Sequence, residues 1–412
     1  MDADLAGAYA AALDAVLRRS HLMPPDEVDT LAVLGAQHLG AETAVLWLVD
    51  YDQSALSRLG GPTGVLTERL SVDGSLAGRC FRSVETLETD GEAGHRLWVP
   101  LLDGLERLGV LEVVLDDGSP PLSDEQQSVL AQFAHLLAEL LVSNGAYTDH
   151  YEWVRRRQAM SLPAEMQHRL LPPLTFGTER VVISGLLAPA YDVGGDAFDY
   201  ALNGNVAHVG IFDAVGHGLQ ASLLTNLAVS CYRNTRRAGL DLAASAAAID
   251  QALDAMFGGE RFVTAMLGQL DVDTGLFRWI NAGHPSAMLV RGSQVVKDLQ
   301  GRPALPLGIN GLLGGDEAFP VSSEALEPGD RLLLLTDGVD EARDADGEFF
   351  GRERLAEFAA KEASSGLPTP EAMRRLQQAV LRHQVGRLQD DATMLFVEWL
   401  SGVGQQMHPD DV

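Results

Sequence analysis

The spacing of hydrophobic residues changes from helical to strand-like and back to helical along residues 1–145. Apolar residues at intervals of three and four predict two helices, over residues 4–17 and 26–39, which a proline pair separates. Strand-like runs divided by Gly- and Asp-rich turns follow at residues 44–49, 64–70, 97–101 and 108–115. A capping box at residues 123–126 then opens a long helix. These patterns predict a small α+β domain.

Residues 146–174 combine a helical stripe with prolines. The stripe consists of large residues recurring every three or four positions: Tyr147, Tyr151, Val154, Gln158 and Leu162. Pro163 interrupts it and starts a further helix, which Pro172 ends. We expect a helical, coiled-coil-like linker here. It serves either as a plain spacer or as a signalling helix that pairs with its twin in a homodimer.

Strand and helix patterns alternate in blocks over residues 175–400. Strands are predicted at residues 181–187, 206–212, 262–270, 276–281, 287–291, 331–335 and 394–398, and helices at residues 218–236, 242–257, 352–361 and 370–383. A tight turn at Asp273-Thr274-Gly275 joins two of the strands, and no βαβ rhythm is present. We therefore expect two packed antiparallel sheets with helices outside, in an α+β protein, followed by a disordered polar tail at residues 401–412.

Acidic residues lie where the apolar runs of this second region end. They are Asp196, Asp213, Asp337 and the doublet Asp390-Asp391. Strand ends are places where a sheet can hold several carboxylates around one point. An Asp beside a Gly is by itself an ordinary turn residue, so the combination carries the prediction. Carboxylates without His or Cys favour a hard, oxygen-ligated cation such as Mg²⁺ or Mn²⁺.

The residues around Asp213 suit phosphate chemistry. The small residues from Ala214 to Gly218 let backbone carbonyls approach an ion, and the helix that follows presents its N-terminus to an anion. Two ions bridged by a carboxylate would lower the pKa of bound water and supply hydroxide for in-line attack on phosphorus. Ser222 and Ser230 have no G-x-S-x-G context, so we expect no nucleophilic side chain.

Composition narrows the class of partner and the compartment. The 412 residues carry a formal net charge of −28, which disfavours nucleic acid and anionic membranes as partners. Two cysteines are too few for a disulfide scaffold. No apolar run reaches the ~20 residues that span a bilayer, and no secretory signal is evident. We expect a cytoplasmic protein.

Five motifs occur in a telling order: VGGDAFDY, FDAVGHG, NAGHP, LLLLTDGVDEA and QDDATMLFV, within residues 193–397. In order and spacing they resemble the stage-II-sporulation-E/RsbU branch of the metal-dependent (PPM) Ser/Thr protein phosphatases, over about residues 160–400. The resemblance implies an α-β-β-α sandwich with two Mn²⁺ or Mg²⁺ ions. It also implies that Asp196 binds the first metal, Asp213 bridges both, Ala214 offers its carbonyl, and Asp337 and Asp390 complete the sites.

Several neighbouring residues keep two readings. Asp391 is the alternative ligand to Asp390, and Asp192 either supports the ligands or caps a turn. His217 is either a general acid on the leaving oxygen or a structural polar group. His284 either orders a hairpin beside the site or takes part in catalysis. The wider family holds the substrate phosphate with an arginine upstream of the first aspartate, and no clear counterpart is evident here.

The N-terminal region resembles a GAF domain over about residues 5–145. The resemblance rests on Trp98-Val99-Pro100-Leu101 followed by a strand that begins with Gly109, and on Ser75-Leu76-Ala77-Gly78 at a helix start. It implies a sensor domain that can bind a small molecule, although no ligand signature is readable. The alternative is a packing or dimerisation domain. Cys80 is interpreted as an inert core residue rather than a redox or chromophore thiol.

The leading hypothesis is a cytoplasmic protein serine/threonine phosphatase under the control of a sensor domain. By resemblance, its substrate is a phosphorylated anti-sigma-factor antagonist, so that dephosphorylation regulates a sigma factor. One alternative is a non-catalytic signalling scaffold. Another is a small-molecule phosphatase, which lacks support because no Gly-rich nucleotide loop or basic cluster is present.

Overall fold

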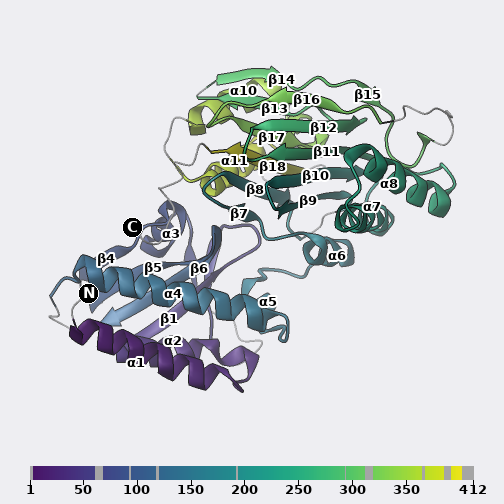
Figure 1. Cartoon of the computed structure of the whole chain (residues 1–412). Coiled ribbons are helices and arrows are strands. Elements are labelled where there is room, and N and C mark those ends of the chain that lie inside the picture. The colour runs from purple at the N-terminus through teal and green to yellow at the C-terminus, as the bar shows by residue number, and fades with distance from the viewer. Residues whose placement is uncertain are drawn as a thin grey trace. The chain divides into compact units, whose positions relative to one another are not determined.

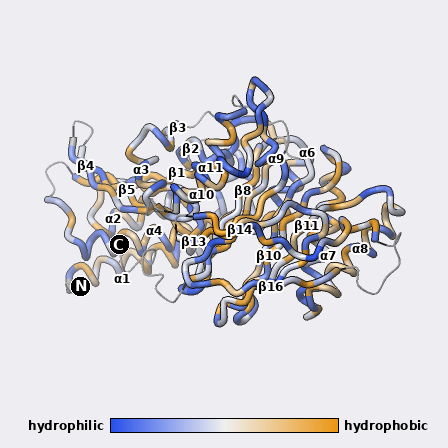
Figure 2. Tube along the Cα trace, turned by 90° about the horizontal axis from the view of Figure 1, so that it is seen from above, coloured by the Kyte–Doolittle hydropathy of each residue, from blue (hydrophilic) through white to orange (hydrophobic). Residues whose placement is uncertain are grey.

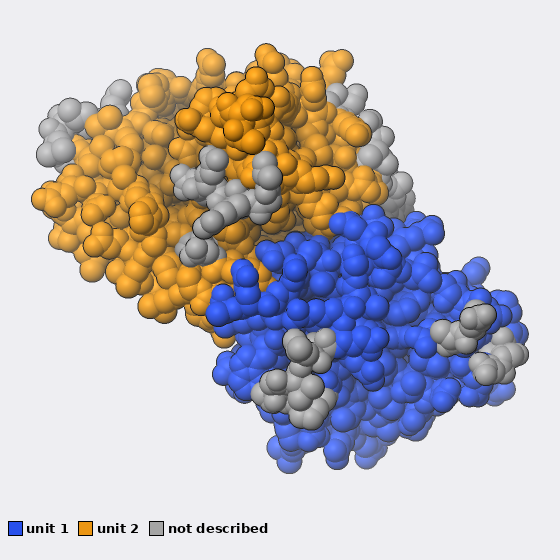
Figure 3. Space-filling view, turned by 180° about the vertical axis from the view of Figure 1, so that it is seen from behind, with its two compact units in different colours: residues 1–159, 405–412 blue, residues 160–404 orange. Residues whose placement is uncertain are grey.

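The computed structural model contains two compact units, which divide between Ala159 and Met160 (Figure 3). It describes residues 3–60, 68–91, 94–116, 120–191, 194–292, 294–310, 319–363, 367–384 and 391–400. The division falls inside the stretch expected as a linker. The polar tail and part of the strand expected at residues 64–70 lie outside the described residues.

The first unit is a six-stranded antiparallel sheet with helices. Its elements are α1 (Ala3–Ser20), a 3-10 turn (Pro25–Glu27), α2 (Val28–His38), β1 (Thr43–Val49), β2 (Ala55–Arg58), β3 (Arg69–Ser71), α3 (Leu76–Ser83), β4 (Leu87–Gly91), β5 (Gly94–Asp103), β6 (Glu106–Leu115), α4 (Asp124–Gly145) and α5 (His150–Arg155). The strand order is β3-β2-β1-β6-β5-β4. Figure 1 labels β1, β4, β5 and β6 of this sheet. The predicted capping box is present, with Ser123 and Gln126 bonding each other's backbone.

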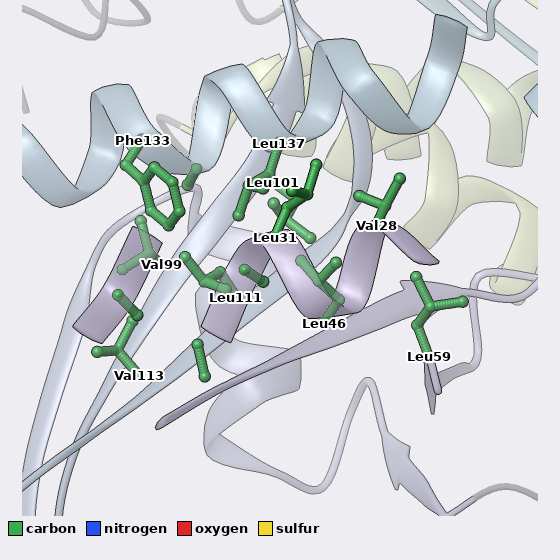
Figure 4. Close-up of a cluster of buried hydrophobic side chains, with 14 of the residues drawn as sticks. Val28, Leu31, Leu46, Leu59, Val99, Leu101, Leu111, Val113, Phe133 and Leu137 are labelled. Carbon is green, nitrogen blue, oxygen red and sulfur yellow. The ribbon is translucent and has the colours of Figure 1, made fainter. Parts of the chain in front are cut away.

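Two hydrophobic cores cover the two faces of this sheet. On one face, side chains of α2 and α4 such as Leu31 and Phe133 pack on Leu46 and Val99 (Figure 4). On the other face, α3 places the fully buried Cys80 in a core with Trp47 of β1 and Trp98 of β5. Burial raises the pKa of the Cys80 thiol well above its usual value, so this cysteine is an unreactive core residue.

The stripe expected to form a coiled coil is divided between two short helices. α5 ends at Arg155, and α6 (Leu162–Leu170) begins only at Leu162. Tyr151 and Val154 are buried in the core of the first unit, so their hydrophobic surface is used within the chain. The expected coiled coil is therefore wrong for this segment. A stripe of large hydrophobic residues needs a surface to pack on, and the first unit supplies that surface.

The second unit contains the rest of the described elements. They are α6, β7 (Thr175–Gly177), β8 (Val181–Ala188), β9 (Asp196–Asn203), β10 (Val206–Ala214), α7 (Leu219–Arg237), α8 (Leu242–Phe257), β11 (Val263–Asp271), β12 (Leu276–Ala282), β13 (Met288–Arg291), β14 (Gln294–Asp298), β15 (Pro303–Ala304), β16 (Ser322–Ala325), β17 (Arg331–Leu335), α9 (Asp337–Asp340), α10 (Gly351–Ala363), α11 (Thr369–His383) and β18 (Ala392–Trp399). One sheet has the order β15-β12-β11-β10-β9 with β16 beside β12, and the other has the order β14-β13-β17-β18-β8-β7.

The two sheets and their helices form the expected α-β-β-α sandwich. One core lies between α7, α8 and the β9–β12 sheet, a second lies between the two sheets, and a third lies between the β8–β18 sheet and α9–α11. Hydrophobic stretches recur along the strands, while projecting loops are hydrophilic (Figure 2). Among the described strands, the ladders are antiparallel except that of β12 with the short β15.

Among the helices of the described residues, none is long and apolar enough to cross a bilayer.

Candidate metal centre

Two of the predicted ligands lie directly opposite each other on neighbouring strands. Asp196 is the first residue of β9, and its antiparallel partner on β10 is Asp213. Directly opposed residues share one face of a sheet, with Cβ atoms about 5 Å apart. Asp196 is buried, with 2% of its surface exposed, and Asp213 is half-buried. The short β9–β10 hairpin therefore brings two carboxylates to one end of the sheet.

Thr336 connects Asp196 to the second sheet. Its Oγ1 donates a hydrogen bond of 2.6 Å to Asp196 Oδ2 and accepts one of 3.0 Å from the backbone nitrogen of Thr393. The backbone nitrogen of Thr336 donates in turn to the carbonyl oxygen of Thr393, at 3.0 Å. Because Thr336 follows β17 directly, Asp337 begins α9 beside this contact, and its side chain is exposed.

Asp391 holds the glycine loop that precedes Asp196. Its Oδ2 accepts hydrogen bonds from the backbone nitrogens of Gly194, at 2.7 Å, and Gly195, at 2.6 Å. An added Cβ would lie 2.6 Å from the nitrogen of Gly218 if it were on Gly194, and 2.8 Å from the carbonyl oxygen of Ala214 if it were on Gly195. The close packing of this loop on the turn after β10 explains why two glycines are needed. It also gives Asp391 a positioning contact.

Two hydroxyl groups of α7 hold the same loop from the other side. Ser222 Oγ donates to the carbonyl oxygen of Gly194 at 2.8 Å, and Thr225 Oγ1 donates to the carbonyl oxygen of Gly195. Both side chains are fully buried. The hydroxyl group of Ser222 therefore holds the glycine loop in place.

The electrostatics of the site suit a cation. Burial raises the pKa of Asp196 well above its usual range, and the neighbouring carboxylates of Asp213 and Asp391 raise it further. A bound cation would relieve both effects, and oxygen donors suit Mg²⁺ or Mn²⁺. Within the described residues, no three His, Cys, Asp or Glu side chains are grouped closely enough to hold a metal ion. Asp390, an expected ligand, lies outside the described residues. Asp192, which was expected either to support the ligands or to cap a turn, lies outside them as well.

The two candidate histidines differ in their surroundings. His217 is exposed, in the turn between β10 and α7. His284 is buried, with Nδ1 2.9 Å from Thr264 Oγ1, and its backbone nitrogen donates to Asn281 Oδ1 at 2.8 Å. Burial lowers the pKa of His284 to about 3, so the imidazole is neutral. The contacts of His284 close the turn after β12.

Gln167 is a site residue that the sequence patterns did not single out. It is fully buried on α6, and its Nε2 donates to the backbone carbonyl oxygen of Asp196 at 2.5 Å. A second contact joins the end of α6 to α7, where Arg233 Nη2 donates to the carbonyl oxygen of Leu170 at 2.6 Å. A buried glutamine within an amphipathic helix is the only signal that could have indicated this role.

Comparison with known proteins bears on the same region. Residues 203–400 match the family model of stage II sporulation protein E (SpoIIE). This part of the chain is similar to the SpoIIE family of phosphatase domains. Asp213, Asp337 and Asp391 lie within the matched range of this SpoIIE domain, and Asp196 lies just before it. The resemblance drawn from the five motifs is confirmed.

Individual relatives of the SpoIIE domain include two bacterial proteins. Protein IcfG of Synechocystis is 32% identical over 138 residues, which cover 33% of this chain and 20% of IcfG. Phosphoserine phosphatase RsbU of Bacillus subtilis is 23% identical over 265 residues, which cover 63% of this chain and 77% of RsbU. Among solved structures, the SiaA-PP2C domain of Pseudomonas aeruginosa is 25% identical, with a TM-score of 0.47, over 57% of this chain and 93% of that domain.

Proposed function

We propose that the second unit is a metal-dependent protein phosphatase that hydrolyses phosphoserine and phosphothreonine. The observation that carries this proposal is the opposition of Asp196 and Asp213 across one hairpin of a SpoIIE domain, where burial and like charge call for a cation. The relative RsbU is named as a phosphoserine phosphatase, which supports the same reaction.

The ligands in this proposal come from four segments of the chain. Asp196, Asp213 and Asp337 would hold Mn²⁺ or Mg²⁺ together with Asp390 and the carbonyl oxygen of Ala214. Bound ions of this kind lower the pKa of water and neutralise charge on a phosphoryl group. Asp391 is assigned to positioning rather than to the metal, because its Oδ2 already accepts two backbone hydrogen bonds.

The chain's own residues would orient the reaction. Thr336 fixes the direction of the Asp196 carboxylate, and the glycine loop stays in contact with the turn after β10. Because Gly216 and Gly218 carry no side chain, a phosphoryl group can approach that turn closely. His217 is exposed there and would give a proton to the leaving serine or threonine oxygen.

A protein substrate fits the surface beside the site. Leu219 and Leu223, on the first turns of α7, are 45% and 48% exposed, so they offer apolar contact to a protein partner. We propose a phosphorylated anti-sigma-factor antagonist in the cytoplasm as this substrate, which would make the protein a regulator of a sigma factor.

The first unit is proposed as a GAF-like sensor for a small molecule, acting in a homodimer. Its antiparallel sheet with helices on both faces supports a ligand-sensing fold of this type. Signals from it would enter the phosphatase unit through α6, whose Gln167 contacts the backbone of Asp196.

The test is release of phosphate from an aryl phosphate and from a phosphoserine protein, with and without Mn²⁺. We expect turnover that depends on Mn²⁺ and that Asp337→Ala reduces by at least ~100-fold, because a metal ligand is lost. Asp346→Ala is the matched control, since Asp346 is an exposed acid in a nearby loop. Turnover of nucleotides alone would favour a small-molecule phosphatase. Binding of a phosphoprotein without any turnover would favour a scaffold.

A further inference from the structure

Arg261 lies at the same end of the sheet as the candidate metal ligands. It precedes β11 by two residues, and β11 pairs with β10 so that Val263 lies opposite Ala214 and Thr264 lies opposite Asp213. The next residue, Phe262, accepts a hydrogen bond of 3.2 Å at its carbonyl oxygen from the nitrogen of Val215. The backbone next to Arg261 is therefore joined to the turn that leaves Asp213.

The guanidinium of Arg261 is directed across that turn. Its Nη1 lies 3.7 Å from the position that a Cβ on Gly216 would occupy, and its Nη2 donates to Gln220 Oε1, on the first turn of α7, at 3.0 Å. Gly216 has a φ of +93°, a conformation that favours glycine, and it leaves the space over the turn open. The guanidinium thus lies beside Gly216, in the turn that follows Asp213 and contains His217.

The backbone of Arg261 is held firmly from its other side. Val263 and Leu307 exchange two backbone hydrogen bonds, of 2.8 and 2.9 Å. The neighbouring Gly308 donates its N–H to the buried Asp250 at 2.6 Å, and an added Cβ on Gly308 would lie 2.9 Å from the carbonyl oxygen of Arg261. Because the backbone is already fixed, binding of a ligand by this side chain does not carry the additional cost of ordering a loop.

The charge of Arg261 is not used within the described part of the protein. Several arginines of the second unit form ion pairs, such as Arg233 with Asp199 and Arg291 with Asp330, whereas Arg261 and the distant Arg278 do not within the described residues. Arg261 has no carboxylate oxygen within 4.0 Å among the described residues, and its side-chain partner Gln220 is neutral. In a chain with a net charge of −28, an arginine kept away from carboxylates beside a catalytic turn calls for an anionic ligand.

We propose that Arg261 binds the phosphoryl oxygens of the substrate and of the phosphate product. The inference rests on the proposed phosphatase function and adds a positively charged side chain that holds the phosphoryl group. A planar guanidinium presents paired N–H donors that match two oxygens of a phosphate monoester. Gln220 occupies one donor nitrogen and so fixes the plane of the group. Arg261 reaches the site from the segment before β11, which follows Asp196 in the chain, so the position differs from an arginine upstream of the first aspartate.

The test compares Arg261→Gln with the wild-type full chain in saturating Mn²⁺. We measure kcat and KM for an aryl phosphate, the inhibition constant of inorganic phosphate, and the Mn²⁺ concentration for half-maximal activity. Loss of a charge-assisted contact predicts a rise of about tenfold or more in both KM and the phosphate inhibition constant. The Mn²⁺ requirement should not change. Arg261→Lys should recover part of the loss, because it keeps the charge but not the paired donors.

Two further variants separate this role from a general effect of charge. Arg278→Gln removes an exposed arginine of β12. Arg278 lies in register with Gln269 of β11 and His208 of β10. His208 is about 17 Å along β10 from Asp213, so Arg278 is far from the candidate site. It should leave all the constants unchanged. Gln220→Glu gives Arg261 a carboxylate partner and should raise KM without altering Arg261 itself.

The possible results distinguish a failure of the proposed Arg261 role from a failure of the proposed phosphatase function. Constants of Arg261→Gln within twofold of wild type, or an equal rise in Arg278→Gln, would overturn the role of Arg261 and leave the phosphatase intact. A wild-type protein that turns over neither substrate would overturn the phosphatase proposal and the phosphate-binding role with it.

Discussion

Two buried carboxylates on β9, Asp196 and Asp199, are compensated in different ways. Asp199 lies between two arginines of α7: its Oδ1 accepts from Arg233 and its Oδ2 accepts from Arg236 at 2.8 Å. Asp196 accepts a side-chain hydrogen bond from the neutral Thr336 and faces other acids. A buried charge without a cationic partner is costly, so the protein stabilises Asp199 by itself, whereas the compensation of Asp196 would depend on the proposed metal ion.

Thr336 is the residue through which this dependence can be measured. Thr336→Val removes the donor to Asp196 and leaves the backbone nitrogen of Thr393 without its acceptor. We expect the free energy of unfolding to fall by about 1–3 kcal/mol. The affinity for Mn²⁺ should fall by about 10–100-fold, as for other residues that orient metal ligands. Urea denaturation and metal titration measure the two effects.

Thr336→Ser is the matched variant because it keeps the hydroxyl group. It should retain most of the Mn²⁺ affinity. If Thr336→Val bound Mn²⁺ as tightly as Thr336→Ser does, the hydroxyl would have no part in orienting Asp196.

At this scale the sequence predicts the acids better than the groups that position them. The acids stand in recognisable turns at the ends of apolar runs, so Asp196, Asp213 and Asp337 could be proposed as candidate ligands from the sequence. Thr336 and Asp196 are 140 residues apart, and Gln167 bonds a backbone atom. Such contacts arise from the packing of the two sheets and of α6, which local patterns do not contain.

Helix α6 is the element that joins the linker region to the candidate site. It carries a donor to the carbonyl oxygen of Asp196 and an acceptor for Arg233 of α7. A shift of this helix would therefore disturb the strand end that carries Asp196. Because these two contacts are specific, their loss should reduce activity by more than the accompanying loss of folding stability would explain.

Gln167→Leu tests this helix with a side chain of similar volume. It removes the donor to Asp196, and we expect Mn²⁺-dependent kcat to fall by about tenfold. The increase in melting temperature on adding Mn²⁺ should also become smaller, which differential scanning fluorimetry measures. Arg169→Ala, on the exposed face of the same helix, is the control. Equal effects of the two substitutions would show that only the stability of α6 matters.

Elements with regular hydrophobic spacing were predicted well, and β9 was not predicted. The apolar runs of β8, β10, β11, β17 and β18 and the helical patterns of α7, α8, α10 and α11 gave bounds close to those observed. β9 contains Asp196 and Asp199, which interrupt its apolar pattern although both are buried. The arginines that make Asp199 tolerable come from α7, so the strand is intelligible only once the two elements are packed together.

The whole molecule consists of two units, each with hydrophobic cores of its own. The first has a core on each face of its sheet, and the second has the three cores of the sandwich. A unit with a complete core can fold independently. The activity and its control should therefore be separable by dividing the chain.

A fragment starting at residue 160 should fold and keep Mn²⁺-dependent phosphatase activity. Its thermal unfolding should reproduce one of two transitions of the full chain, which calorimetry resolves. If the first unit controls the site, the basal rates of the fragment and the full chain should differ by at least a factor of about five, the low end of typical couplings between sites. Equal rates and equal Mn²⁺ affinity under every sensor condition tested would contradict control by the first unit.

The eight paired positions of β9 and β10 have a consequence for how this site can be altered. Side chains alternate between the faces of a strand, so one residue inserted into either strand would turn Asp196 or Asp213 to the opposite side of the sheet. A substitution on the exposed turn around Gly204 leaves that alternation intact. In evolution or engineering, insertions and deletions in these two strands should therefore be tolerated less well than most substitutions, because the site depends on the number of residues in each strand.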